Sequence, residues 1–362
     1  MKKNILALAV AGALVAPMVA MADVEVYGKA HVSTGQLDNS GTDGKRLFME
    51  TNNSNVGFRG TEDLGGGLKA MYQAEVGMNW DGGTGATGTG AGWGAGRDTW
   101  VGLGGDWGAV LLGRMNSPYK MSTNDYDPFA DTFADYNGIL GVSPTGQAHD
   151  IRLSNTIAYA TNTISGFKGV LGYAMNDGVG INTAAKVDAL ELSLNYGMGP
   201  LSAAVGYSNI SQGGYTPTGA TKADNNSAWK IGAGYKFGND NTAINAVYEN
   251  IDAGTNGAAT DKASRAAYYV SATQKVEAWK FALGYGSAAK IKGLDDTGAT
   301  MYQLGAFYSL SKATQTYVAY SQVKDKTNTK LYGLKADSFV PSANGESAKG
   351  LMVGIIHNFS SK

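Results

Sequence analysis

The chain has 362 residues and a composition unlike that of ordinary soluble domains: 52 residues are glycine, about twice the usual share, and only 16% are charged, against about 25%. A hydrophobic content of 43% is too high for a disordered chain. The 29 basic and 30 acidic residues nearly cancel, which argues against a nucleic-acid partner, and the absence of cysteine excludes disulfides and thiolate metal sites.

The first 22 residues have the features of a secretory signal peptide. Two lysines open the segment, residues 5–15 form an apolar stretch too short to span a bilayer, and Ala-Met-Ala at 20–22 supplies the small residues that a signal peptidase reads. We therefore expect export and a mature chain of residues 23–362. Nothing after residue 22 offers the run of about 18 apolar residues that a membrane-spanning helix needs.

The mature chain is rich in segments with the period of a β-strand. Residues 229–237 place apolar side chains at every odd position with lysine or glycine between them, and residues 279–286 follow a similar scheme. Because side chains alternate faces along a strand, each segment has one apolar face and one small or polar face. In chain order this pattern predicts 16 strands, over residues 24–34, 51–60, 67–79, 97–104, 108–115, 150–160, 167–175, 188–197, 200–209, 228–238, 241–251, 265–275, 278–287, 300–310, 314–323 and 349–359.

The connectors between these segments alternate in length to the end of the chain. Long connectors have about 12 to 34 residues and short ones about 2 to 6, which is the pattern of transmembrane barrels with tight periplasmic turns and long external loops. A soluble sandwich has no reason to place every long loop at one end. In lipid only a closed sheet satisfies every backbone group of a strand, and a sheet of this size encloses water. We therefore predict an all-β fold, a 16-stranded antiparallel transmembrane β-barrel.

Five segments, in order, resemble general diffusion porins of Gram-negative outer membranes. They are VEVYGKA at 24–30, NVGFRGTEDLGGGLKAMYQAE at 55–75, VGLGGDWGAVLLGR at 101–114, RLSNTIAY at 152–159 and the last strand, which ends at Phe359. The resemblance implies a homotrimeric outer-membrane barrel whose third external loop folds into the lumen. It also implies passive diffusion of small hydrophilic solutes and ions, with no enzymatic activity and no metal or cofactor.

The longest connector, residues 116–149, is where we expect function to lie, because a long loop in a compact protein is more often functional than idle. The resemblance makes it the constriction loop of the pore. One lysine, Lys120, accompanies four aspartates in it: Asp125, Asp127, Asp131 and Asp135. We expect these aspartates to form the acidic side of the constriction. The alternative is a solvated acidic surface loop.

A basic wall is expected opposite this loop. By strand parity, Lys29 and Arg152 project away from their apolar neighbours and therefore into water. The resemblance places Lys29, Arg97 and Arg152 in the basic cluster of the porins, whereas Asn55 stands where many relatives have another arginine. Possible substitutes, which could also be rim charges or turn contacts, are Arg46, Arg59 and Arg114. Facing charges sort ions by a transverse field, and the acidic loop favours a weak cation preference.

Other signals are weaker. GTGATG at 83–88 matches a dinucleotide fingerprint, but no apolar helix follows it, so we expect a flexible external loop, which in the family can contact a neighbouring subunit. The three histidines, His31, His149 and His357, are far apart in sequence, and no nucleophile motif accompanies them. Phe359 is similar to the terminal phenylalanine that the barrel-assembly machinery reads, although residues 360–362 follow it here.

The sequence therefore predicts an exported outer-membrane porin. Its expected partners are two further copies of the chain, outer-membrane lipid and lipopolysaccharide, and, during biogenesis, the barrel-assembly machinery and periplasmic chaperones. Four alternatives stay open: a substrate-specific channel of the same fold, a barrel enzyme with His149 or His357 as base, an adhesin, and a soluble β-sandwich lectin. Saturable flux, loss of a hydrolytic activity on replacing either histidine, and extraction without detergent would identify the first, second and last of these.

Overall fold

The computed structural model describes residues 23–39, 44–82, 92–144, 148–175, 186–213, 225–238, 240–253, 263–335, 341 and 343–362. The predicted signal peptide and the 83–88 motif lie outside these ranges. The strands are β1 (Glu25–Asn39), β2 (Gly44–Thr51), β3 (Asn55–Gly65), β4 (Leu68–Asn79), β5 (Gly92–Gly105), β6 (Gly108–Asn116), β7 (Arg152–Ala160), β8 (Phe167–Ala174), β9 (Lys186–Met198), β10 (Leu201–Gly213), β11 (Asn226–Phe237), β12 (Thr242–Ala253), β13 (Ala263–Val276), β14 (Trp279–Ala288), β15 (Ala299–Ser309), β16 (Thr314–Asp325) and β17 (Ser347–Ser360). Between β6 and β7 lie α2 (Pro118–Thr123), η1 (Asn124–Tyr126) and η2 (Tyr136–Gly138). No helix among the described residues is long and apolar enough to cross a membrane.

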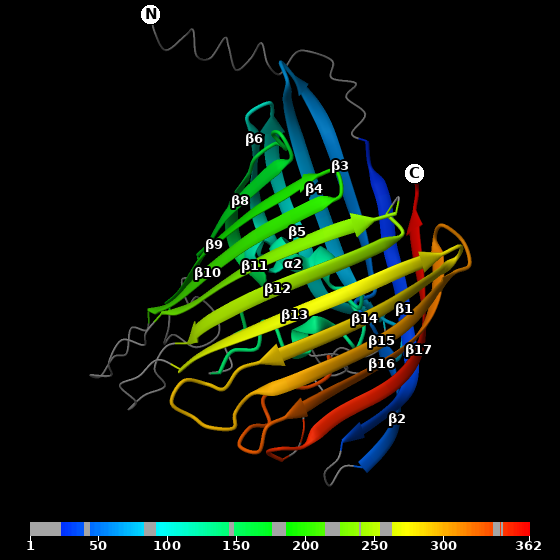
Figure 1. Cartoon of the computed structure of the whole chain (residues 1–362). Helices are drawn as coiled ribbons and strands as arrows, with labels where there is room; N and C mark the ends of the chain where they lie inside the picture. Colours follow the sequence, from blue (N-terminus) through cyan, green and yellow to red (C-terminus); the bar gives the residue numbers. More distant parts are fainter. Residues whose placement is uncertain are drawn as a thin grey trace, which may run out of the picture.

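The strands form one antiparallel sheet that closes on itself. Most strands pair with their neighbours in sequence, and β17 returns to β1 in a register that runs from Tyr27↔Ser360 to Asn39↔Ala348. Two strands share the other edge of β1, because β2 pairs with its residues 32–39 and β3 with its residues 25–29. Since β2 and β3 form one interrupted crossing, the 17 described strands make 16 crossings, as the sequence predicts (Figure 1).

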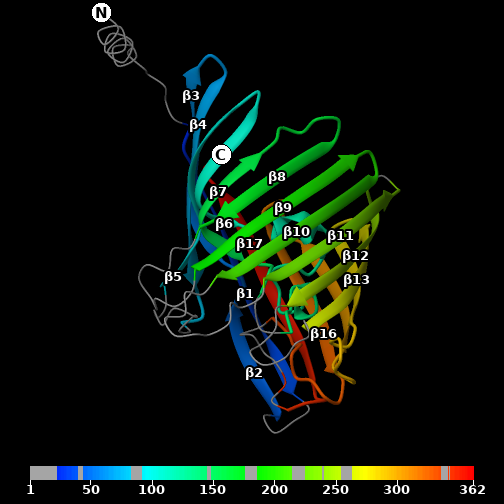
Figure 2. The ribbon, with the colours of Figure 1, turned by 90° about the vertical axis from the view of Figure 1, so that its left-hand side faces the viewer.

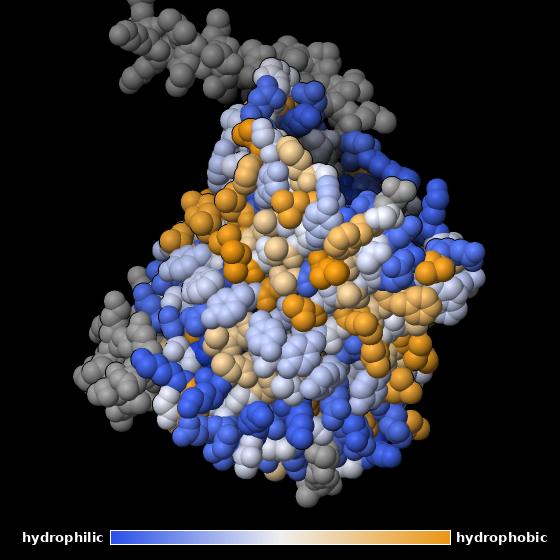
Figure 3. Space-filling view, in the orientation of Figure 1, coloured by the Kyte–Doolittle hydropathy of each residue, from blue (hydrophilic) through white to orange (hydrophobic). Residues whose placement is uncertain are grey.

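The outer surface of the barrel is apolar, which inverts the pattern of a soluble protein. On β11, Trp229, Ile231 and Tyr235 are 43–50% exposed, whereas Ala228 and Lys230 on the other face are buried. Figure 3 shows apolar residues running across the strands in a band, with hydrophilic residues gathered along one end of the barrel. The large apolar side chains therefore face lipid, and the small and polar ones face the interior.

The structure corrects the first external connector. The sequence predicts a long connector over 35–50, but β1 continues to Asn39 and β2 begins at Gly44. Residues 34–39 of β1 hydrogen-bond to β17 on one side and to β2 on the other, so ladder pairing extends the strands beyond their apolar part. Polar residues in this extension do not alternate with apolar ones, which is why the sequence pattern missed it.

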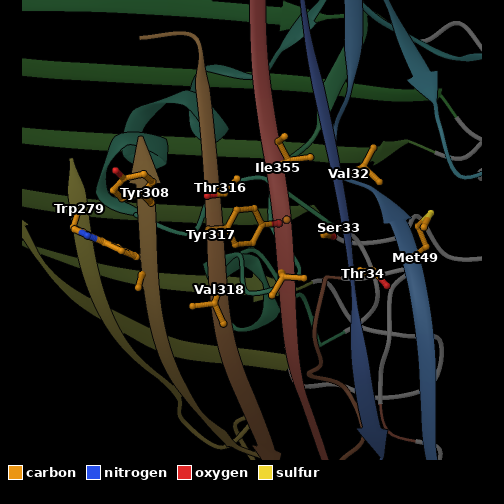
Figure 4. Close-up of a pocket in the computed structure, with 13 residues that line it drawn as sticks. Val32, Ser33, Thr34, Met49, Trp279, Tyr308, Thr316, Tyr317, Val318 and Ile355 are labelled. Carbon is orange, nitrogen blue, oxygen red and sulfur yellow. The ribbon is translucent and has the colours of Figure 1, made fainter. Parts of the chain in front are cut away.

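The outer wall has a hollow near the seam between β17 and β1. Its volume is about 560 Å³, and its lining includes Val32, Met49, Trp279, Tyr308, Val318 and Ile355 (Figure 4). Two small side chains of the same wall, Ala306 and Thr316, lie between these large ones and deepen the surface. Because the hollow lies on the lipid-facing side, it is separate from the aqueous interior.

Candidate functional site

Residues 117–144 and 148–150 run along the inner face of the wall. Ser117 begins α2 by accepting a hydrogen bond from the Lys120 backbone N–H (3.1 Å), and Pro118 occupies the first turn, where its missing N–H costs nothing. The helix contacts β8 to β11, and Figures 1 and 2 both show it within the ring of strands. The segment is therefore positioned inside the barrel.

An apolar core fixes one side of this segment to the wall. Phe129, Phe133 and Ile139 are almost completely buried, in one cluster with inward-facing side chains of β12 to β17. Glycines make the close approach possible: a Cβ atom at Gly305 would lie 2.7 Å from the ring of Phe129, and one at Gly350 would lie 2.9 Å from the ring of Phe133. Each buried aromatic side chain contributes roughly 1.5–3 kcal/mol to this attachment.

A buried ion pair fastens the same side. The Glu249 carboxylate accepts hydrogen bonds from the Tyr119 hydroxyl (2.8 Å) and the Gly141 backbone N–H (2.9 Å), and it pairs with Arg265 (2.9 Å). Arg265 also donates to the carbonyl oxygens of Ile139 (3.1 Å) and Val142 (2.6 Å). Both charged side chains are inaccessible to solvent. No sequence motif marks this pair, although strand parity places both residues on the inward face of β12 and β13.

A second set of buried polar contacts holds the end of the segment. Lys230 pairs with Asp150 (2.7 Å), which also accepts a hydrogen bond from the Asn137 side chain (2.7 Å). His149 lies beside them with its Nδ1 2.9 Å from the Ser208 hydroxyl. Burial lowers the pKa of His149 to about 4, so the imidazole is neutral at pH 7. The buried side of the segment that packs against the wall is called the closed side below. These contacts neutralise the buried charges there and attach the segment to the wall.

The other side of the segment faces β1 to β7 through polar side chains. Asp131 pairs with Lys29 (2.5 Å) and accepts a hydrogen bond from Asn53 (2.5 Å). Arg97 donates to the Asn53 side chain (2.8 Å) and pairs with Glu75. The segment thus meets the wall through a continuous polar network.

Local backbone geometry and charge position Asp131 in this network. Asn53 and Asp131 both have left-handed backbone, with φ of 51° and 61°, a conformation that Asn and Asp adopt more readily than other non-glycine residues. Partial desolvation by the surrounding wall works against the ionised form of Asp131, but the Lys29 ammonium, the Asn53 amide and Arg97 outweigh it and lower the pKa of this carboxyl. Asp131 is therefore a charged group on the partly exposed side of the segment, which is called the open side below.

The remaining predicted basic residues are Arg46 on β2, Arg59 on β3, Arg114 on β6 and Arg152 on β7. Arg152 pairs with Asp98 (2.8 Å), and Arg59 pairs with Glu25 (2.7 Å). Arg114 donates to Ser154 (2.6 Å) and to a backbone carbonyl oxygen, and within the described ranges it has no carboxylate partner. Lys29, Arg97 and Arg152 therefore lie near the segment, each beside its own carboxylate.

The four predicted aspartates do not form one acidic wall. Asp127 is buried, and it accepts hydrogen bonds from the backbone N–H groups of Phe129 (2.9 Å) and Tyr136 (2.8 Å). Burial and the nearby Asp135 raise the pKa of Asp127 well above its ordinary value. Asp135 caps η2, and burial raises its pKa as well. Of the four aspartates, Asp131 is the one that pairs with a predicted basic residue, Lys29.

The histidines do not form an accessible catalytic centre. His149 is completely buried, so no solute reaches its contact with Ser208. His31 is also buried, against the hydroxyl of Tyr317 (2.9 Å). His357 contacts Thr314 through its Nδ1 (2.9 Å). Among the described residues no group of three or more histidine, aspartate or glutamate side chains is arranged to hold a metal ion.

The residues after Phe359 continue the seam of the barrel. The Ser361 backbone N–H donates to the Val26 carbonyl oxygen (2.8 Å), and the Val26 N–H donates to the Ser361 hydroxyl (3.0 Å). Ser360 donates to Glu25 (2.6 Å). The three-residue extension therefore adds pairing between β17 and β1, while the role of Phe359 in assembly stays a prediction.

Comparison with known sequences covers nearly the whole chain. A family model described as Gram-negative porin matches residues 7–328. Outer membrane porin protein 32 of Delftia acidovorans is 30% identical over 370 residues, which make up 99% of this chain and 100% of that protein. Major outer membrane protein P.IB of Neisseria meningitidis serogroup A is 36% identical over 189 residues, or 50% of this chain and 52% of that protein.

Comparison with solved structures gives the same answer. The anion-selective porin from Comamonas acidovorans has a TM-score of 0.78 and 29% identity, with 93% of this chain and 100% of that chain covered. The family that the five sequence segments predict is thus confirmed, and these relatives are channels rather than enzymes. Sequence and structure agree along almost the entire chain, which therefore belongs to the Gram-negative porin family and spans the outer membrane as a β-barrel.

Proposed function

We propose that this porin lets small hydrophilic solutes and ions diffuse passively through its lumen, past a constriction between Asp131 and the basic residues of β1, β5 and β7. The observation that carries the proposal is the one-sided packing of residues 117–144 and 148–150. Buried contacts attach the segment to the wall from β9 to β17 and to Leu37 of β1, whereas partly exposed polar side chains such as Lys29 meet it from the wall of β1 to β7. The aqueous path therefore runs along the polar side, and selectivity comes from its width and charge.

The charges along this path support a weak anion preference. The acidic segment by itself predicts a weak cation preference, but burial removes Asp127 from the path, and Lys29 neutralises Asp131. Of the predicted basic residues Lys29, Arg59, Arg97, Arg114 and Arg152, four pair with the carboxylates Asp131, Glu25, Glu75 and Asp98, and Arg114 adds one positive charge without a carboxylate partner within the described ranges. An anion-selective relative at 29% identity is in line with this balance.

The assembly that we propose is a homotrimer, as the resemblance to general diffusion porins implies. A solved relative in the family's fold, OmpT of Vibrio cholerae, is described in a trimer form. Outer-membrane lipid, lipopolysaccharide and the assembly machinery stay expected partners. The mass of the detergent-solubilised protein, measured by light scattering with the detergent contribution subtracted, would give three chains per particle.

The experiment is single-channel recording in a planar bilayer under a KCl gradient, together with swelling of liposomes in sugars of increasing size. We expect steady ohmic steps, a small reversal potential of the sign that chloride preference gives, and swelling rates that fall smoothly with solute size. A reversal potential of the opposite sign would instead support the weak cation preference that the sequence predicts. Saturable uptake would favour a substrate-specific channel, and folded protein without conductance would overturn the diffusion pore.

A further inference from the structure

Three charged side chains that lie together inside the barrel differ from the ion-paired residues of the interior. Lys29, Arg97, Arg152, Lys230 and Arg265 each pair with a carboxylate. Lys168, Lys236 and Asp125 are exposed and take part in no ion pair within the described ranges. A charge that no protein partner satisfies is available to a solute.

These three groups line one pocket of about 390 Å³, together with Asn195, Ser202 and Asn245. The volume lies within the range of about 300–1,000 Å³ that small-molecule sites occupy. Its lining comes from α2 and η1, from the turn before β8 and from five consecutive strands, β8 to β12.

The pocket lies inside the barrel at the end with the short turns. Phe167, Tyr235 and Phe237 are exposed on the outer wall, so the alternate residues Lys168 and Lys236 face inward. Lys168 follows the short turn before β8, and Lys236 precedes the short turn after β11. Short turns mark the periplasmic side of such barrels, which places the pocket in the periplasmic half of the lumen.

The polar groups of the pocket have defined directions. The Asn195 side-chain amide donates to the Ser122 carbonyl oxygen (2.8 Å), and that of Asn245 donates to the Ser271 hydroxyl (3.2 Å). Their Oδ1 atoms are therefore the groups available to a solute's donors. Gly234 keeps the space open, because a Cβ atom there would lie 2.5 Å from Asn245 Oδ1 and 2.7 Å from the Ser202 hydroxyl.

We propose that this pocket binds an acidic amino acid, a solute with two carboxylates and one ammonium group. The two carboxylates pair with Lys168 and Lys236, and the ammonium group contacts Asp125 and the amide oxygens of the asparagines. This complement of two positive charges and one negative charge mirrors the charges of the solute. The inference rests on the proposed diffusion function, within which the pocket is a weak stopping point for such solutes.

The test is ligand-observed NMR titration of the detergent-solubilised protein with L-glutamate at low ionic strength, since salt screens exposed charges. We expect saturable binding with a dissociation constant on the order of 1 mM. Glutarate, which lacks the ammonium group, and L-glutamine, which lacks one carboxylate, should each bind at least threefold more weakly. KCl conductance is recorded on the same preparation, so a closed pore and an absent site are told apart.

Variants separate the contributions. The double variant Lys168→Gln/Lys236→Gln should weaken L-glutamate binding at least tenfold, and Asp125→Asn should remove the preference for L-glutamate over glutarate. Gly234→Ala fills the pocket without changing its charge and should weaken the binding of both L-glutamate and glutarate. Lys312→Gln, at an exposed turn outside the pocket, is the matched control and should change nothing. Absence of saturable binding, or binding that the double variant leaves unchanged, would overturn the proposal.

Discussion

The two sides of the inner segment, residues 117–144 and 148–150, use the same kinds of charged residues for different purposes. On the closed side, Glu249 and Arg265 have no exposed surface and share their hydrogen bonds with the backbone of the segment. On the open side, the Lys29 and Asp131 side chains are 20% and 40% exposed. Burial makes the Glu249–Arg265 pair costly to break, because the charge that remains has neither its partner nor water to stabilise it. Solvent makes the second pair weak in energy but able to act on passing ions.

The largest expected effect comes from Glu249→Gln, which breaks the closed side. Arg265 would stay buried without its carboxylate, so we expect a loss of about 3–5 kcal/mol of folding free energy and noisy channel currents from a loosened segment. The loss of folding free energy is measured by denaturing the protein in detergent and monitoring the unfolding by circular dichroism. Adding Arg265→Leu should recover a large part of the loss, and a single variant as stable as the wild type would contradict this account.

His149 makes the closed side sensitive to acid. Its pKa is lowered to about 4 by burial, against an ordinary value of about 6.5, so between these values only the unfolded chain binds the proton. Stability is therefore full above pH 6.5 and falls as pH drops toward 4, by roughly 1–3 kcal/mol. Thermal melts from pH 4 to pH 8 would show this dependence. The His149→Asn variant should lose the part of this fall in stability that is due to His149. An unchanged pH profile would rule out His149 as the source of the fall.

The open side should respond in selectivity and hardly in stability. Asp131→Asn leaves Lys29 unpaired and should shift the reversal potential toward anion preference, whereas Lys29→Gln should shift it toward cation preference. Each should change folding free energy by about 1 kcal/mol or less, because the pair is partly exposed. Bilayer recordings under a KCl gradient measure the shifts. Two shifts of the same sign would show that the pair does not line the path.

Arg114→Gln should have the smallest effect. Arg114 has only neutral partners, Ser154 and a backbone carbonyl oxygen, so its removal leaves no unpaired carboxylate behind. We expect a slight reduction in anion preference, smaller than the effect of Lys29→Gln, and no measurable change in melting temperature. An effect larger than that of Lys29→Gln would move the centre of the constriction from Asp131 to β6.

Much of the wall was predictable from local patterns. Alternation in segments such as residues 229–237, together with the alternating connector lengths, gave the 16 crossings with boundaries close to those observed. The prediction of a long first connector over residues 35–50 was wrong, because residues 34–39 are held in the strand by pairing on both edges rather than by an apolar face. The family followed from motifs spread along the chain.

The interior was less predictable, because charge in a sequence does not reveal burial. Four aspartates in one segment read as one acidic surface, yet Asp127 is enclosed by backbone N–H groups and Asp131 meets Lys29. Glu249 and Arg265 carry no motif at all. Their importance arises because residues 139–141 return against β12 and β13, more than a hundred positions away in sequence.

By itself, the sequence determined the closed barrel, its family and the segment that enters it, because lipid on one side and water on the other impose a period of two on every strand. Only the tertiary structure decided which charges attach that segment and which face the path. That division depends on how deeply each side chain is buried and which partner meets it there, and both are set by contacts between residues far apart in the chain.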